Sequence, residues 1–402
     1  AVGTAAYADR LGNRGFSGTS LAAPLVSGAA AIIKSLRPDL SAAQVIGVLK
    51  ASAADLTPTA GRDHGLGSGL LDVSAAVQRA LALPVGGSST ETSEQFIVGA
   101  LGFGSFPQIK IMRADGSLYK SFFAYAPTYS GRINLAVADV NGDGTDEVIT
   151  GTGRGGGSHV RVFTTEGKLL HQFFAEDPKA RNGVQVAAGD LDGDGKAEIV
   201  TTPNPGSPPR LRVFRADGTL MTGFDVYAPT FRGGVQAAIG DLDGDGQGEI
   251  VVAPGPGGGP HVRVYSHTGQ LKAQLFVYNA LTRTGVAVAT ADLGGDGRKE
   301  VVVAALSTAQ PTVKVFGGLA FETLGEFLMP GDTDWSTGLT LAGGDLDGDG
   351  SAELVAGRLD GAPTVAVMSW QGKSIRTFAG HAAGGYRGGI RVGTLRLSAP
   401  SR

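Results

Sequence analysis

The sequence predicts a mainly β protein, a six-bladed β-propeller preceded by a partial α/β domain that supplies mostly helices. Three observations support this fold class. Glycine accounts for 65 of 402 residues, about 16% against a usual ~7%, which indicates many tight turns and therefore many short strands. An acidic motif recurs five times from residue 139 onward, at intervals of 51, 51, 51 and 53 residues. The first 83 residues lack this repeat and follow a helical pattern.

Residues 1–83 contain three expected helices: Leu25–Leu36, Val45–Ala53 and Val73–Leu83. The first is almost entirely apolar, which predicts a helix buried on all sides. Ser41 and Gln44 form a capping-box pattern before the second helix, and Asp72 can cap the third. Three helices are too few for an independent domain. We therefore expect residues 1–83 to be part of a larger domain. A linker rich in Gly and Ser, residues 84–95, separates this part from residues 96–402.

Each repeat has the same internal order of strands and turns. In the repeat around residue 241 the expected strands are Val235–Gly240, Glu249–Ala253, His261–Tyr265 and Leu271–Tyr278. The acidic loop joins the first two, and Gly-rich turns join the others. Four antiparallel strands in about 50 residues correspond to one blade of a propeller.

The two ends of the array predict how the propeller closes. Phe96–Met112 has the pattern of a second and third strand, with no first strand or acidic loop before it. Gly389–Leu397 resembles a first strand with no acidic loop after it. Pairing of the two completes a sixth blade and leaves no open sheet edge in the ring.

The acidic motif has Asp at positions 1, 3 and 5 and Gly at positions 4 and 6, which brings three oxygen ligands into one tight turn. An EF-hand requires a carboxylate at position 12 and flanking helices. Position 12 here is uncharged and lies inside an expected strand, so the EF-hand interpretation fails. The carboxylate stands at position 9, which gives a nine-residue loop between two strands. Several oxygen ligands favour Ca²⁺ over Mg²⁺, which takes fewer protein ligands.

The candidate Ca²⁺ ligands are the side chains at positions 1, 3, 5 and 9 and the carbonyl at position 7: Asp139, Asn141, Asp143, Thr145, Glu147; Asp190, Asp192, Asp194, Lys196, Glu198; Asp241, Asp243, Asp245, Gln247, Glu249; Asp292, Asp296, Arg298, Glu300; Asp345, Asp347, Asp349, Ser351, Glu353. Gly294 occupies position 3 of the fourth loop, so we expect that loop to bind weakly or not at all. The alternative is that these are plain acidic hairpin turns. Clustered carboxylates repel one another until a cation neutralises them, so the expected role of the metal is structural.

On these motifs, residues 96–397 resemble the FG-GAP/VCBS repeats of calcium-binding β-propellers, of which the integrin α-subunit head is the best-known relative. The stretch Phe231-Arg-Gly-Gly-Val, the motif Asp241-Leu-Asp-Gly-Asp-Gly and the segment Gly257–Tyr265 carry the resemblance. Glu at position 9, where Asp is usual, and Gly294 depart from the family pattern. The resemblance implies Ca²⁺ as the cofactor and an extracellular or cell-surface location.

A second segment with chemical potential surrounds Ser20. A serine at the N-terminus of a helix can be a simple N-cap, or a nucleophile whose surroundings hold an oxyanion. The segment Gly18-Thr-Ser-Leu-Ala-Ala-Pro-Leu-Val-Ser-Gly28 resembles the nucleophile segment of subtilisin-like serine peptidases. The likeness continues through Arg37-Pro-Asp-Leu-Ser and Gly65-Leu-Gly-Ser-Gly-Leu-Leu-Asp-Val. It implies that Ser20 is the acyl-forming nucleophile and that its backbone N–H is one oxyanion donor.

The other parts of a serine peptidase site are missing from the residues before Ser20. In the family the Asp and His of the triad and the Asn of the oxyanion hole precede the serine, and no His lies among residues 1–19. By the same likeness Asp9 belongs to the loop before the nucleophile, and His64 belongs to the closing turn. Without a base the hydroxyl is a weak nucleophile. We therefore expect this chain alone to be inactive and to be a fragment of a complete peptidase.

Two recurring side-chain positions offer further binding surfaces. Basic residues recur on the third strand of successive repeats, either as a ring for an anionic partner or as stems packed along their blades: Lys110, Arg161, Arg212, Arg263 and Lys314. Aromatic residues recur in the loops before the first strands, where they can form a face for a glycan or protein ligand or pack between blades: Tyr129, Phe231, Trp335 and Tyr386.

Composition excludes several classes of function. A net charge of −3 provides no basic field for nucleic acid, the absence of Cys excludes disulfide scaffolds and cysteine nucleophiles, and no apolar run is long enough to span a membrane. The leading hypothesis is a bacterial, secreted subtilisin-like serine endopeptidase that acts on peptide or protein substrates. Its Ca²⁺-binding propeller would serve targeting, adhesion or stability. The alternative is a non-enzymatic calcium-binding adhesion or surface-recognition protein that carries a peptidase remnant.

Overall fold

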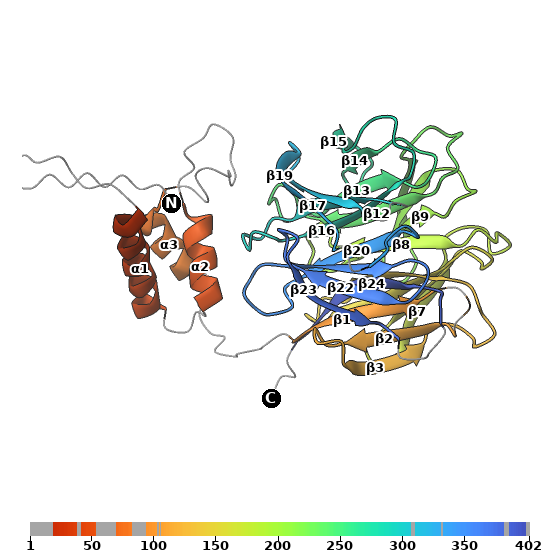
Figure 1. Cartoon of the computed structure of the whole chain (residues 1–402), viewed down its shortest axis with the longest axis horizontal. Helices are drawn as coiled ribbons and strands as arrows, with labels where there is room; N and C mark the ends of the chain where they lie inside the picture. Colours follow the sequence, from red (N-terminus) through yellow and green to blue (C-terminus); the bar gives the residue numbers. More distant parts are fainter. Residues whose placement is uncertain are drawn as a thin grey trace, which may run out of the picture. The chain divides into compact units, whose positions relative to one another are not determined.

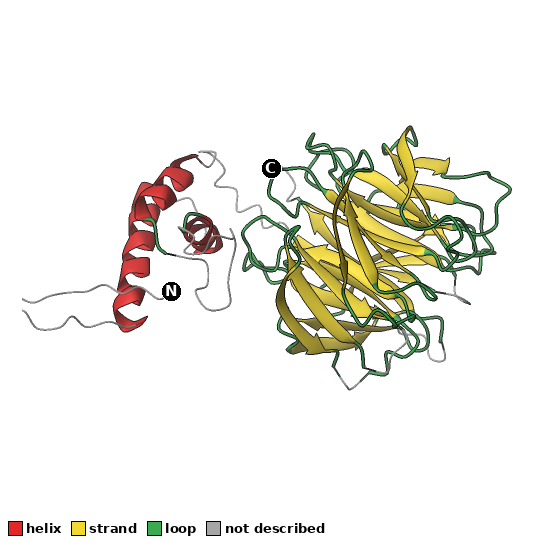
Figure 2. Cartoon of the chain, turned by 90° about the horizontal axis from the view of Figure 1, so that it is seen from above, coloured by secondary structure: helices red, strands yellow, loops and turns green. Residues whose placement is uncertain are grey.

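A computed structural model describes residues 19–37, 42–53, 70–82, 94–102, 104, 106–306, 310–330, 333–381 and 386–398. The chain divides by its internal contacts into two compact units, with the main boundary between Thr92 and Ser93. Among the described residues, the helices belong to the first unit and the strands to the second (Figure 2).

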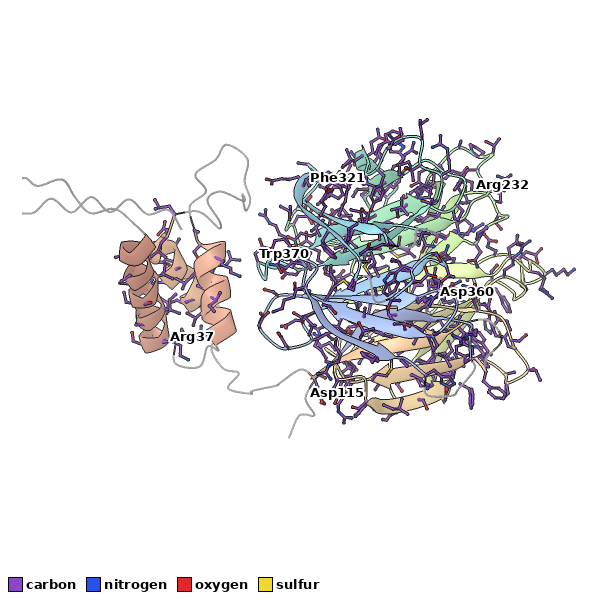
Figure 3. All side chains as sticks on the ribbon, in the orientation of Figure 1. Arg37, Asp115, Arg232, Phe321, Asp360 and Trp370 are labelled. Carbon is purple, nitrogen blue, oxygen red and sulfur yellow. The ribbon has the colours of Figure 1, made fainter. Side chains whose placement is uncertain are left out.

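The first unit contains three helices: α1 (Thr19–Leu36), α2 (Ala42–Ala51) and α3 (Val73–Ala82). Ala29 and Ile33 of α1 pack against Val45 and Val48 of α2 and Ala76 of α3. At the end of α1 the Arg37 guanidinium donates a hydrogen bond to the Ala80 carbonyl at 2.6 Å, and Figure 3 labels this residue. No helix of the described segments is long and apolar enough to cross a membrane.

The prediction that the first helix is buried on all sides is wrong for this structure. Leu25, Ile32 and Leu36 are each about half exposed, since the core contacts of α1 with α2 and α3 involve its other side. The prediction that Asp72 caps the third helix is confirmed, because its Oδ1 accepts the amide of Ala75 at 2.8 Å. The expected capping box at Ser41 lies outside the described residues.

The second unit consists of six four-stranded antiparallel sheets, each one blade. From the inner to the outer strand the blades are: β24 (Ile390–Leu397), β1 (Glu94–Leu101), β2 (Gln108–Met112), β3 (Leu118–Phe123); β4 (Ile133–Ala138), β5 (Glu147–Thr152), β6 (His159–Phe163), β7 (Leu169–Phe174); β8 (Val184–Gly189), β9 (Glu198–Pro203), β10 (Arg210–Phe214), β11 (Leu220–Asp225); β12 (Val235–Gly240), β13 (Glu249–Pro254), β14 (His261–Tyr265), β15 (Leu271–Phe276); β16 (Val286–Ala291), β17 (Glu300–Ala305), β18 (Thr312–Gly317), β19 (Glu322–Leu328); β20 (Leu339–Gly344), β21 (Glu353–Arg358), β22 (Thr364–Met368), β23 (Ser374–Ala379).

The inner strands surround a common axis. Each contacts the next in the order β24, β4, β8, β12, β16, β20 and back to β24. In Figure 1 the labels of β8, β12, β16 and β20 lie toward the middle of the strand unit, and those of β3 and β15 lie at its rim. The six-bladed propeller predicted from the repeat is therefore confirmed.

The closing blade forms as the sequence predicts. β24, the last strand, pairs antiparallel with β1, the first, from Glu94 opposite Leu397 to Leu101 opposite Ile390. This pairing joins the two ends of the propeller segment within one sheet and removes the edge that β1 would otherwise expose. Phe96, Val98 and Leu395 are completely buried at this joint, which indicates a well-packed closure.

The burial of the strands explains why their apolar pattern is clear in the sequence. Every residue of β5, β9 and β13 is buried, because the second strand of a blade is covered on both faces by neighbouring blades. The strand β15, the fourth of the blade around residue 241, ends at Phe276, two residues before the predicted end at Tyr278. The Tyr278 hydroxyl instead donates hydrogen bonds to carbonyls of the next blade, at Val303 and Thr312.

The recurring basic residues join neighbouring blades. Arg161 donates to the Ala124 carbonyl at 2.8 Å and lies over the Tyr125 ring of the preceding blade. In the next repeat Glu176 replaces the tyrosine and forms a salt bridge with Arg212 at 2.7 Å. The other members of the set are Arg263 over Tyr227, Lys314 over Tyr278, and Lys110 in contact with His381. Two members of the set meet a carboxylate, since Arg212 pairs with Glu176 and Lys314 pairs with Glu326. Of the recurring aromatic residues, Trp335 is fully buried.

Candidate metal centres

The five acidic loops occupy equivalent places in five blades. Each joins the first strand of its blade to the second, as between β4 and β5 or β8 and β9. The first strand ends one residue before position 1, and the second strand begins at position 9. The structure therefore places all the candidate ligands within five short strand-to-strand loops, as the sequence predicts.

The aspartate at position 1 organises the backbone of its loop. Asp190 Oδ1 accepts the amide of Gly193 at 2.7 Å, and its Oδ2 accepts the amide of Gly195 at 2.8 Å. Both glycines have a positive φ, 80° and 83°, which a side chain would strain. Asp139 and Asp241 make the same two hydrogen bonds in their loops. This folding turns the position 1 carboxylate inward, where its remaining lone pairs can bind a cation.

The glutamate at position 9 anchors the base of each loop. Its Oε2 accepts the amide of the residue at position 2 in all five loops, at 2.7 to 3.1 Å: Val140, Leu191, Leu242, Leu293 and Leu346. Sequence reasoning missed this second role, because it depends on hydrogen-bond geometry that residue spacing does not reveal. Burial raises the pKa of Glu147, Glu198 and Glu300 to about 7.

Three loops bring carboxylates together closely enough to share one ion. The clustered side chains are Asp190, Asp192 and Asp194; Asp241, Asp243 and Glu249; and Asp345, Asp347 and Glu353. Within each cluster one oxygen from every residue lies within 4.8 Å of the others. Hard oxygen donors at this spacing suit a divalent cation such as Ca²⁺. The residues present therefore fit the metal that the motif predicts.

The first and fourth loops differ from these three. Among the described residues, neither has three carboxylates within the same distance. In the first loop the Asn141 amide donates to Glu147 Oε1 at 2.9 Å, so position 3 faces position 9 as a ligand would. In the fourth loop a Cβ added to Gly294 would lie 3.8 Å from Glu300 Oε1 and 3.9 Å from Asp296 Cγ. The missing side chain would point at the other candidate ligands.

A lysine contacts the carboxylates of the third loop. Lys272, on β15, donates to Glu249 Oε1 at 2.5 Å and to Asp243 Oδ2 at 3.1 Å. Burial lowers the pKa of Lys272, but these two hydrogen bonds raise it above its ordinary value overall. The equivalent position one repeat earlier, on β11, is Met221. The lysine is therefore not part of the repeat pattern. The ammonium group therefore already supplies positive charge where a metal would bind.

The residues at positions 7 and 8 link each loop to its neighbour. The amide at position 8 donates to the position 1 carbonyl of the preceding loop at 2.8 Å, as Ala197 does to Asp139 and Gly248 to Asp190. At position 7 the Thr145 hydroxyl bonds the Ser398 hydroxyl at 2.6 Å, whereas the predicted role of position 7 as a carbonyl ligand stays a prediction. The acidic loops thus form a continuous chain along one face of the propeller.

Ser20 is the second residue of α1, which begins six residues before the predicted helix start. Its side chain lies outside the described residues, as do Asp9 and His64. The role of Ser20 as a nucleophile therefore stays a prediction.

Comparison with known protein families separates the two units. A profile described as FG-GAP-like repeat matches residues 139–201, 190–252 and 241–303. Together these segments run from the acidic loop of the second blade into β17 of the fifth blade and include four of the five acidic loops. A profile of the subtilase family matches residues 5–69, most of which lie outside the described residues.

Individual proteins are similar to parts of this chain. Integrin alpha-V of Gallus gallus is 30% identical over 168 residues, which cover 37% of this chain and 16% of the integrin. A crystal structure of a protein of unknown function from Bacteroides caccae has a TM-score of 0.50 at 15% identity and covers 76% of this chain and 100% of its own. The exotype rhamnogalacturonan lyase YesX has a TM-score of 0.38 at 17% identity and covers 79% and 68% of the two chains. The chain thus contains FG-GAP-like repeats built into a six-bladed β-propeller.

Proposed function

We propose that the propeller is a calcium-dependent recognition and stabilising module, with Ca²⁺ held in its acidic loops. The single observation that carries this proposal is the gathering of three carboxylates within 4.8 Å in each of three equivalent loops. Like charges so close repel one another, and a bound cation removes that repulsion. The integrin-like repeats support an extracellular or cell-surface setting, where millimolar calcium can fill weak sites.

Thermal unfolding with and without calcium tests this proposal. Added Ca²⁺ should raise the Tm of the propeller, because a ligand that binds only the folded state stabilises it. The double variant Asp192→Asn with Asp194→Asn should respond less to Ca²⁺ and should be more stable than wild type in calcium-free buffer. Asp217→Asn, in an exposed hairpin turn of the same blade, is the matched control. An identical Tm in EGTA and in saturating calcium would overturn the proposal.

We further propose that the whole chain is part of a secreted subtilisin-like serine endopeptidase, with Ser20 as nucleophile and peptides or proteins as substrates. The segment Gly18-Thr-Ser-Leu-Ala-Ala-Pro24 and the subtilase profile over residues 5–69 support this assignment. The Asp and His of the triad must then lie upstream in the same reading frame. The propeller would anchor, target or stabilise the catalytic unit.

A gene product that extends upstream of Ala1 tests the peptidase assignment. It should hydrolyse a denatured protein substrate and react with a fluorophosphonate probe, and Ser20→Ala should abolish both. Asp217→Asn should leave both intact. An upstream sequence with no His-bearing and Asp-bearing segments would contradict the assignment. The similarity to integrin alpha-V would then favour the second candidate function, a non-enzymatic adhesion or surface-recognition protein.

A further inference from the structure

The centre of the propeller contains a small polar cavity remote from the acidic loops. Its walls are the second and third residues of the six inner strands, whereas the acidic loops follow the last residues of these strands. The cavity has a volume of about 70 Å³ and is partly open. Five of the six second residues are polar: Asn134, Gln185, Gln236, Thr340 and Arg391. The sixth is Ala287, and no carboxylate lines the cavity.

Arg391 brings a cation without a counter-ion into this cavity. Within the described part of the chain its side chain makes no hydrogen bond or salt bridge, and its Nε is buried without a partner. Asp360, labelled in Figure 3, pairs with Arg132 at 2.7 Å. Burial, and secondarily the charge of Arg132, lowers the pKa of Arg391 to about 10, which leaves it charged at neutral pH.

Asn134 also lines this cavity and carries an acceptor without a partner. This side chain is only 2% exposed, and its Nδ2 donates to the Val184 carbonyl of the next inner strand at 2.6 Å. A carbonyl can only accept, so this bond fixes the amide with Nδ2 toward Val184 and Oδ1 away from it. Oδ1 is buried and has no partner. Buried polar atoms without partners are rare and costly, and they point to a bound molecule.

A guanidinium donor and an amide acceptor together define a ligand. We propose that the central cavity binds a carboxylate that carries an adjacent hydroxyl group, a 2-hydroxy acid. The carboxylate would meet Arg391, and its hydroxyl would donate to Asn134 Oδ1. Arg391 and Asn134 both line the cavity, from the neighbouring strands β24 and β4.

The cavity discriminates against other anions by its acceptor. A water needs about 10–15 Å³ of such space, so the cavity accommodates a group the size of several waters. A carboxylate with its adjacent hydroxyl fits this limit, and the rest of a larger acid can extend through the opening. Sulfate presents only acceptor oxygens, which the Asn134 Oδ1 atom would repel. Acetate satisfies Arg391 and leaves Oδ1 unpaired.

Calorimetric titration of the calcium-saturated full chain with glycolate, acetate and sulfate tests the proposal. Glycolate should bind about tenfold more tightly than acetate, because only glycolate donates to the buried acceptor. Sulfate should bind more weakly than glycolate. Equal affinity for glycolate and acetate, tighter binding of sulfate, or no glycolate binding at millimolar concentrations would overturn the proposal.

Two variants locate the site. Arg391→Met should abolish glycolate binding, and Arg396→Met, an exposed arginine on the same strand, should leave it unchanged. Gln236→Glu adds a carboxylate to the cavity wall and leaves every hydrogen bond described for this wall in place. It should abolish glycolate binding and raise the Tm, since Arg391 then gains a partner. A lower Tm of Gln236→Glu, or glycolate binding by Arg391→Met equal to that of wild type, would contradict the assignment.

Discussion

The backbone amide of Asp146 donates to the Arg396 carbonyl at 2.9 Å, and the Asp146 carboxylate accepts the Arg396 amide at 2.6 Å. This reciprocal pair ties the acidic loop of the second blade to β24, the strand that closes the ring. At the same position the other loops make a single amide-to-carbonyl hydrogen bond to the preceding loop, such as that from Ala197 to Asp139. The carboxylate of Asp146 therefore holds together two segments 250 residues apart.

Asp146→Ala should weaken the closure of the ring. It leaves the Arg396 amide without its acceptor, which costs about 1–3 kcal/mol of unfolding free energy. Asp146→Asn should cost less, because the amide oxygen can still accept and burial disfavours the charge of Asp146, whose pKa is raised. Denaturant unfolding followed by the fluorescence of buried Trp335 measures both changes. Asp115→Ala, in an exposed hairpin turn, is the control, and an equal loss in both alanine variants would refute the role of Asp146.

Gly294→Asp should create an additional calcium site in the fourth loop. A side chain at this position points toward Glu300 and Asp296 at ordinary contact distances, so the aspartate fits without displacing them. Calcium bound per chain, measured by atomic emission after dialysis, should rise by one. Gly294→Ala adds the Cβ without the carboxylate and should leave the count unchanged. A correctly folded aspartate variant that binds no additional calcium would show that position 3 does not supply a ligand.

Lys272→Met should increase the calcium affinity of the third loop. The lysine makes two charge-assisted hydrogen bonds to Glu249 and Asp243, which must break before both carboxylates can bind Ca²⁺. Loss of this competition should lower the Kd about tenfold or more. Amide NMR signals of Gly244 and Gly246 report this loop individually during a calcium titration. The exposed Lys168→Met is the control, and an unchanged midpoint for Lys272→Met would disprove the competition.

His381 should make propeller stability decrease in mild acid. Its Nδ1 accepts a hydrogen bond at 2.6 Å from Lys110 Nζ, which links the segment after β23 to β2, and its ring contacts Tyr386. Burial, followed by the charge of Lys110, lowers the pKa of His381 below 6.5. The unfolded chain therefore takes up the proton first, so the stabilisation is present above about pH 6.5 and is lost as the pH falls below it.

The Tm of wild type and of His381→Gln, measured between pH 7.5 and 5 in saturating calcium, checks this effect. Glutamine can accept from Lys110 without titrating, so the wild type should lose more stability than the variant over this range. His267→Gln, in a hairpin turn, should behave like wild type. Parallel pH profiles for wild type and His381→Gln would exclude the coupling.

The sequence predicted the propeller well because its strands repeat and are buried. Strands β12 and β14 have the predicted bounds, and the pairing of β24 with β1 follows from the repeat interval. Side chains in these strands alternate between two faces and make contacts that recur in every blade. Both features determine which residue types occur at each position. The helix α1 was predicted less well, since an apolar run does not reveal which of its faces other helices cover.

The sites were predictable only in part. The carboxylate positions in the loops follow from motif spacing, but the bond from each position 9 glutamate to the position 2 amide does not. Lys272 and Arg391 reach their places through the packing of strands that are distant in sequence, and neither belongs to a repeated pattern. Such departures from the repeat, visible as single substitutions at equivalent positions, are the signal that could have identified them.

Calcium titration of the metal-free chain, with the number of bound ions counted by calorimetry, tests the central claim most directly. Five loops carry the motif and one lacks its position 3 ligand, so the account predicts about four sites per chain. Magnesium at the same concentrations should not displace the bound calcium. Absence of saturable calcium binding at millimolar concentrations would show that the acidic loops are turns and not metal centres.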